Sequence, residues 1–155
     1  MNISEKAHPI IAITPAAGGS ALAGDYISIK KADHVTVAVQ ITQGNAATVA
    51  LTLYQATAVA GTAAKALAQD VKIYAVLDAA ASDVMVEQTD GVAFTTDAAV
   101  KNKIVVFEVP AEAIDVNNDF DCLQVRAGAS NAANIVSATY WCSGERYHNT
   151  TKIVD

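Results

Sequence analysis

The side chains of this 155-residue chain that could do chemistry are few, and their spacing matches no catalytic motif. The histidines His8, His34 and His148 lie far apart, and none belongs to an HExxH pattern or another metal-ligand spacing. Ser20 and Ser143 lie beside glycines, but neither has a glycine two residues away on both sides, as a nucleophile elbow requires. No glycine-rich phosphate-binding pattern is present either. We therefore expect no enzymatic activity and no bound cofactor.

An acidic stretch at residues 115–121 carries side-chain oxygens at alternating positions and so imitates the beginning of a calcium loop. It departs from the EF-hand pattern because Phe120 stands where the turn glycine belongs and Arg126 where the bidentate glutamate belongs. Asn and Asp also stabilise tight turns by hydrogen bonding to nearby backbone groups. The sequence therefore favours a polar turn that leads into a strand, with calcium binding as the alternative.

The two cysteines, Cys122 and Cys142, do not form a CxxC pair. Each lies within a predicted strand, so the thiols would be close if those two strands were neighbours. Thiols stay reduced in a cytoplasm, and a buried cysteine packs as a small hydrophobic side chain. We expect buried, reduced thiols, and the sequence leaves open whether the two are close or bonded.

The composition argues against several classes of protein. With 10 Lys+Arg against 16 Asp+Glu, the formal net charge of -6 repels phosphate backbones, so we expect no nucleic-acid partner. No apolar run approaches the roughly 18 residues that a membrane-spanning helix needs, so we expect no membrane partner. A chain with 52% hydrophobic and 17% charged residues is not expected to be disordered. Its length is that of one domain, which would bury about two thirds of its surface and needs no metal or disulfide.

Alternating apolar residues predict β-strands along most of the chain. In the clearest case, residues 34–42, four apolar side chains from Val35 to Ile41 point to one face. A turn at residues 44–45 and renewed alternation at residues 49–54 predict that these two strands form a hairpin. Further strands are predicted at residues 26–30, 71–77, 84–89, 104–109, 121–127 and 135–142. Because each strand has one apolar face, we predict an all-β fold, either an antiparallel β-sandwich or a jelly-roll-like barrel.

Brief helical turns are predicted at residues 63–69, from their helix propensity, and at residues 110–114, which begin with proline. The first 24 residues contain two prolines and a Gly-Gly pair, which favour either an extended N-terminal arm or an edge strand followed by a loop. The predicted organisation is an arm or edge strand at residues 1–24, a β-sandwich domain at 25–147 and a C-terminal tail at 148–155.

Several segments resemble a family of small virion proteins that are encoded among the head genes of tailed bacteriophages and prophages. The most distinctive segment reads LYQATAVAGTAAKAL, at residues 53–67. The other similar segments are residues 24–30, 33–37, 108–109, 113–117 and 120–127. The resemblance spans roughly residues 20–147. It implies a structural component of the phage head, specifically a capsid decoration (cement) protein, and it supplies no catalytic residue.

A decoration protein would bind the major capsid protein of the assembled head and stabilise it by bridging capsid subunits. It would be made in the bacterial host cytoplasm and would end on the outer surface of the phage head, where it could form a homo-oligomer such as a trimer. Candidate capsid contacts are Ile10, Ile11 and Ile13 in the N-terminal segment and Tyr147 near the C-terminus.

Two alternatives remain open at this point. One is another virion component, such as a head fibre base, a connector or a tail protein. The other is a carbohydrate- or cell-surface-binding β module, in which Trp141, Tyr140 and Tyr147 would stack on a sugar. Tyr140 and Trp141 are adjacent, so we expect one of them in the core and the other at the surface.

Overall fold

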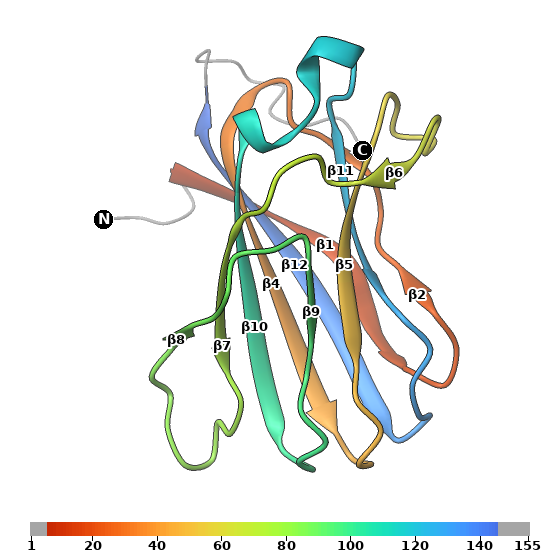
Figure 1. The fold of residues 1–155 in the computed structure, drawn as a ribbon, viewed down its shortest axis with the longest axis vertical. Helices are drawn as coiled ribbons and strands as arrows, with labels where there is room; N and C mark the ends of the chain where they lie inside the picture. The colour runs from red at the N-terminus through yellow and green to blue at the C-terminus, as the bar shows by residue number, and fades with distance from the viewer. Residues whose placement is uncertain (1–5, 146–155) are drawn as a thin grey trace.

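Two antiparallel β-sheets pack against each other around one core (Figure 1). The computed structural model describes residues 6–145. Sheet A has the order β1 (Ala7–Ala17), β12 (Asn134–Glu145), β4 (Ala32–Gln43), β10 (Asn102–Pro110), β7 (Lys72–Val76) and β8 (Val86–Glu87). Sheet B has the order β2 (Leu22–Ala23), β11 (Cys122–Ala127), β5 (Ala50–Ala56) and β6 (Lys65–Ala66), while β3 (Ile27–Ser28) pairs with β11 and β9 (Ala93–Thr95) with β5. The predicted all-β sandwich is confirmed, and no closed barrel forms.

The core consists of the inward-facing side chains of both sheets. On β4, the predicted apolar face from Val35 to Ile41 is buried, while Thr36 and Gln40 point outward. Leu51 of β5 in the other sheet belongs to the same apolar cluster. The period of two in the sequence therefore identified the buried face correctly, because side chains alternate across a strand.

The predicted hairpin between residues 34–42 and 49–54 is wrong. The two strands exist, but β4 lies in sheet A between β12 and β10, whereas β5 lies in sheet B between β11 and β6. Both strands bury their apolar faces in the shared core, which places them opposite each other rather than side by side. At the crossing, Gly44 passes so close to the residue before β12 that a Cβ atom on Gly44 would lie 2.6 Å from the Ala133 carbonyl oxygen.

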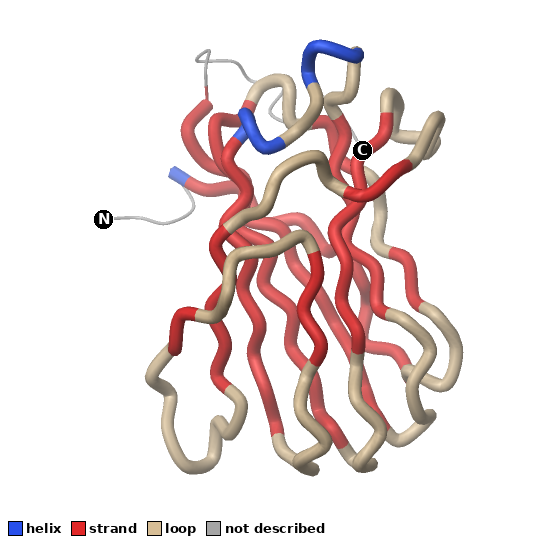
Figure 2. Tube along the Cα trace, in the orientation of Figure 1, coloured by secondary structure: helices blue, strands red, loops and turns tan. Residues whose placement is uncertain are grey.

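The predicted helical turn at residues 110–114 is confirmed as the 3-10 helix η1 (Ala111–Ala113), and a second one, η2 (Val116–Asn118), follows it at the same end of the sandwich (Figure 2). The predicted turn at residues 63–69 is wrong. This segment contains β6, because Leu67 inserts into the core and Lys65 binds the Asp115 carboxylate. These tertiary contacts outweigh the modest helix propensity of the segment.

The N-terminal segment forms an edge strand rather than an extended arm over residues 7–17. Strand β1 pairs with β12 in the register Ala7↔Ser143 to Ala17↔Ile135 and belongs to the sandwich itself. Shifts in register on both sides of Ile13 mark bulges. Prolines are tolerated in a strand mainly at a sheet edge, and Pro9 and Pro15 lie in β1, the outermost strand of sheet A.

Candidate functional site

His34 forms a polar cluster on the outer face of sheet A. Its Nε2 atom lies 2.6 Å from Glu108 Oε2, and the hydroxyl of Thr36 donates to the same oxygen at 2.7 Å. In a catalytic triad the histidine lies between the nucleophile and the carboxylate. Here the carboxylate lies between His34 and Thr36, so the histidine is not placed to take a proton from the Thr36 hydroxyl. The arrangement holds two neighbouring strands, β4 and β10, together at the surface.

Residues 115–121 form the polar turn that the sequence favoured. The Asp115 carboxylate accepts hydrogen bonds from Lys65 and Asn118, and the Lys65 bond holds the pKa of Asp115 below its usual value. Asp121 is bound by Lys30 and Ser28 on the other side of the turn. Within residues 6–145, no three His, Cys, Asp or Glu side chains gather into a group that could hold a metal ion.

The two thiols are free and buried, as expected. Cys122 lies on β11 in sheet B and Cys142 on β12 in sheet A, so they are not on neighbouring strands. Burial raises the pKa of each thiol to about 12. A nucleophilic cysteine needs a thiolate near neutral pH, so both side chains act as packing residues.

The four candidate capsid contacts are in different environments. Ile11 is 63% exposed on the outer face of β1, Ile10 is half-buried against the core, and Ile13 is buried within it. Ile13 is therefore not available to a partner, because a β1 bulge turns both Ala12 and Ile13 toward the core. Tyr147 lies outside the described residues.

On the outer face of sheet A, the side chains paired across β1, β12 and β4 around Ile11 are uncharged, and this surface ends at the Thr36–Glu108 contact. Two rows of directly paired residues cross β1, β12 and β4. One row is Ile11, Thr139 and Ala38, and the other is Pro9, Trp141 and Thr36. Directly paired residues of an antiparallel sheet point to the same face. We call these six residues the sheet A face: Pro9, Ile11, Thr36, Ala38, Thr139 and Trp141. Its mixture of apolar, small and hydroxyl side chains suits contact with another protein better than catalysis.

Tyr140 and Trp141 point to opposite faces, as predicted. Trp141 is half-buried in the sheet A face, whereas Tyr140 is fully buried, and burial raises its pKa. The Tyr140 hydroxyl accepts a hydrogen bond from the Val125 amide and donates one to the Asp25 carbonyl. Tyr140 therefore cannot stack on a sugar, which removes one of the three aromatic residues of the carbohydrate alternative.

Sequence reasoning missed a buried lysine. Lys103 faces the core side of β10, and its ammonium group donates to Gln43 Oε1 at 2.8 Å, to the Ala99 carbonyl at 2.7 Å and to Asp97 Oδ1 at 2.7 Å. The Lys103 hydrogen bond lowers the pKa of Asp97. The predicted strand at residues 104–109 begins one residue after Lys103, and no pattern in the sequence indicates that a loop folds back over this lysine.

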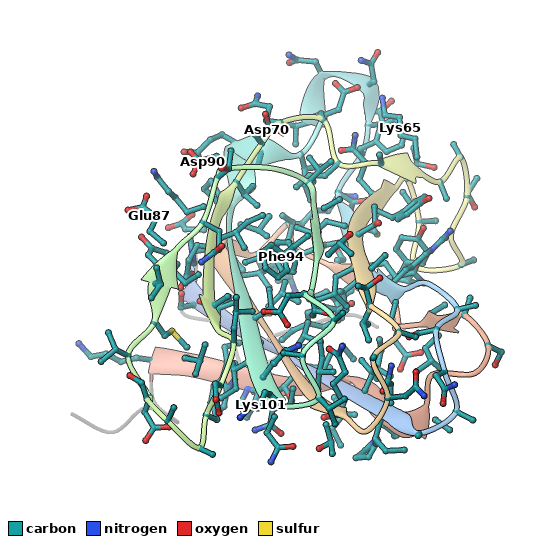
Figure 3. The ribbon with its side chains drawn as sticks, turned by 60° about the horizontal axis from the view of Figure 1, so that its bottom comes forward. Lys65, Asp70, Glu87, Asp90, Phe94 and Lys101 are labelled. Carbon is teal, nitrogen blue, oxygen red and sulfur yellow. The ribbon has the colours of Figure 1, made fainter. Side chains whose placement is uncertain are left out.

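Several other charged side chains form pairs at the periphery. Lys72 Nζ lies 2.6 Å from Glu87 Oε1 and 3.3 Å from Asp90 Oδ1, and Lys101 pairs with Asp78. Figure 3 shows Glu87 and Asp90 on one side of the molecule and Lys101 at a loop end, with Phe94 toward the middle. Pairs of this exposed kind contribute little to stability. In the described part of the chain, no helix has the length and apolar character to cross a membrane.

The comparisons with known proteins concern the fold. No protein-family model and no curated protein matches the chain. Among solved structures, the SPBc2 prophage-derived protein YomS is similar, with a TM-score of 0.52 and 9% sequence identity. The likeness covers 88% of this chain and 93% of that chain. The two proteins therefore share a sandwich fold over most of their length.

Proposed function

We propose that the chain is a structural protein of a bacteriophage virion that decorates the outside of the assembled head. The observation that carries the proposal is the fold shared with a prophage-derived protein across most of both chains. The resemblance of residues 53–67 and the other quoted segments to virion proteins of phage head genes supports the same assignment.

The sheet A face supplies a suitable contact surface. Ile11 is exposed at its edge, and none of the six residues is charged. The interior of a protein interface is depleted in charged residues, because burying an unpaired charge is costly. We therefore place the capsid contact on this face, with Ile11 as its most exposed apolar side chain.

The mechanism would be bridging of capsid subunits. A site composed of several subunits exists only on the assembled shell, so each bound copy stabilises the lattice and not the free subunit. Several weak contacts from one rigid body add up once the first is made. The proposal places the protein on the outer surface of the head after synthesis in the host cytoplasm, and it includes homo-oligomers that repeat these contacts.

Sedimentation with purified capsids tests this function. The protein should co-sediment with undecorated heads of the phage or prophage that encodes it, and Ile11→Asp should weaken this binding about tenfold or more. Val100→Asp is the matched control, because Val100 is similarly exposed but lies on a loop outside the sheet A face. Both variants should keep the wild-type melting temperature. Absence of binding to assembled heads contradicts the proposal.

Other outcomes would favour the alternatives. Binding to isolated tails or connectors would indicate another virion component, and binding of the isolated domain to a glycan array would indicate a carbohydrate module. Genes for a portal, a protease and a major capsid protein beside this gene would independently support the head assignment.

A further inference from the structure

A shallow groove crosses the outer face of sheet B, on the side of the sandwich away from the sheet A face. It has a volume of about 310 Å³, and its floor is made largely of small side chains from β2, β11 and β5. Arg126 of β11 pairs with Ala23 of β2 and with Thr52 of β5, so all three line the middle of the groove. The groove thus combines a floor of mostly small side chains with a single cation.

Neutral groups hold the Arg126 guanidinium in place. Its Nε donates to Gln124 Oε1, its Nη2 donates to the Tyr26 hydroxyl at 3.1 Å, and the group lies 3.9 Å from the centre of the Tyr54 ring. Gln124 is itself fixed, because its amide donates to the Gly24 carbonyl. The guanidinium is therefore oriented before any ligand arrives, which lowers the entropic cost of binding.

Arg126 has no acidic partner within the described residues, whereas most of the lysines there do. Each of the following lysines pairs with at least one carboxylate: Lys30, Lys65, Lys72, Lys101 and Lys103. No carboxylate among residues 6–145 forms an ion pair with Arg126. A guanidinium has five N–H donors, and the bonds to Gln124 and Tyr26 leave both Nη1 donors and one Nη2 donor for a ligand.

We propose that this groove binds an aspartate or glutamate side chain on an extended segment of a protein partner, with the carboxylate held by the free Nη1 and Nη2 donors of Arg126. Planar carboxylates match this fork of donors in a bidentate geometry. A sugar is disfavoured because Arg126 already covers the Tyr54 ring face on which it would stack, and a nucleic acid is disfavoured by the net charge of -6. The identification of the partner as a capsid subunit rests on the proposed function.

The first test needs no capsid. The ¹⁵N-labelled protein is titrated with the blocked tripeptides Ac-Ala-Glu-Ala-NH2 and Ac-Ala-Gln-Ala-NH2 and observed by NMR. We expect saturable shifts of the Arg126 side-chain Nε resonance and the Thr52 amide with the glutamate peptide only, and their loss at about 1 M sodium chloride. Equal shifts with both peptides, or shifts elsewhere, overturn the proposal. Tighter binding of glucuronate than of the glutamate peptide overturns the assignment to a protein partner.

The second test uses capsid sedimentation with two pairs of variants. Arg126→Gln should weaken binding about tenfold or more, whereas Lys101→Gln, with the same change in charge on the loop before β10 of sheet A, should not. Because Arg126→Gln also removes contacts within sheet B, Thr52→Glu is the second variant: it keeps Arg126 and places a competing carboxylate directly opposite it. Gln69→Glu is its control, because it adds the same charge at an exposed loop position outside both the groove and the sheet A face, and it should bind capsids like the wild type.

The outcomes of the two tests separate the proposals. If the wild-type protein does not bind capsids, the proposed function fails, while the peptide titration still decides whether the groove binds a carboxylate. If the peptide binds at Arg126 but both Arg126→Gln and Thr52→Glu bind capsids like the wild type, the capsid subunit is not the partner of this groove.

Discussion

Replacing Tyr140 with phenylalanine removes one oxygen atom that joins the two sheets. Strands β2 and β3 both pair with β11, but between them the chain turns away from β11 after Gly24, whose N–H donates to the Val125 carbonyl. The Val125 amide of β11 therefore has no strand partner at this point and donates to the Tyr140 hydroxyl at 2.9 Å. The hydroxyl in turn donates to the Asp25 carbonyl at 3.0 Å. One side chain of sheet A thus closes a gap in sheet B.

The loss in stability follows from the two broken bonds. Val125 is fully buried, and leaving its N–H without an acceptor costs about 1–3 kcal/mol. The bond to the Asp25 carbonyl contributes about 0.5–1.5 kcal/mol, because that residue is exposed and its carbonyl can turn to water. The unfolding free energy should therefore fall by about 2–4 kcal/mol. For a domain of this size that corresponds to a decrease in melting temperature of about 4–16 °C.

Thermal denaturation and hydrogen exchange measure this effect. Tyr74→Phe is the control, since Tyr74 is half-buried on the outer face and its hydroxyl makes no hydrogen bond within residues 6–145. Tyr140→Phe should also speed exchange of the Val125 amide while leaving the other β11 amides protected at their reduced global stability. If both phenylalanine variants melt within about a degree of each other, the hydroxyl does not hold the sheets together as argued.

Two further predictions concern buried charge and buried thiols. Asp97→Asn should lower the unfolding free energy by about 2–3 kcal/mol, because it leaves the Lys103 cation buried with neutral partners, whereas Asp78→Asn at an exposed pair should change it little in urea denaturation. Cys122 and Cys142 should not react with a thiol reagent at about pH 8 until the protein unfolds. Burial raises the pKa of both thiols from 9.0 to about 12, so their contribution to stability is complete below pH 9 and is lost as the pH rises toward 12. A variant with both cysteines replaced by alanine should therefore lose unfolding free energy less steeply between pH 9 and 12. Equal slopes for the variant and the wild type would contradict the raised thiol pKa values.

The positions of β4, β5, β7, β10, β11 and β12 and their buried faces were predictable because they depend on local alternation, whereas the short strands β6 and β9 were not predicted. Residues 34–42 correspond to β4, and the buried side chains are those that the period of two selected. The partner of each strand was not predictable in this way. A turn between two alternating segments is compatible both with a hairpin and with a crossing to the opposite sheet. The close approach of Gly44 to Ala133 accompanies the crossing, but these two residues are far apart in the sequence, so no local pattern indicates it.

The candidate contact surface was predictable only in part. Ile11 was selected as part of a short apolar run, but the same run includes Ile13, which the bulge in β1 turns into the core. Bulges have no reliable sequence signal in a segment flanked by prolines. The Arg126 groove and the His34–Glu108 contact join strands from distant parts of the chain, and only the arrangement of the strands brings their side chains together.

The pairing of β1 with β12 also determines when the sandwich can form. During synthesis β1 emerges before the other described strands, but its only partner strand among the described residues is the last of them, with Ala7 opposite Ser143. Strand β12 also separates β1 from β4, so both strands keep an unpaired edge on the ribosome until residues 134–145 have left the exit tunnel. Sheet A must therefore be completed after most of the chain has been made, and nascent chains that stall before β12 would expose two strand edges to aggregation.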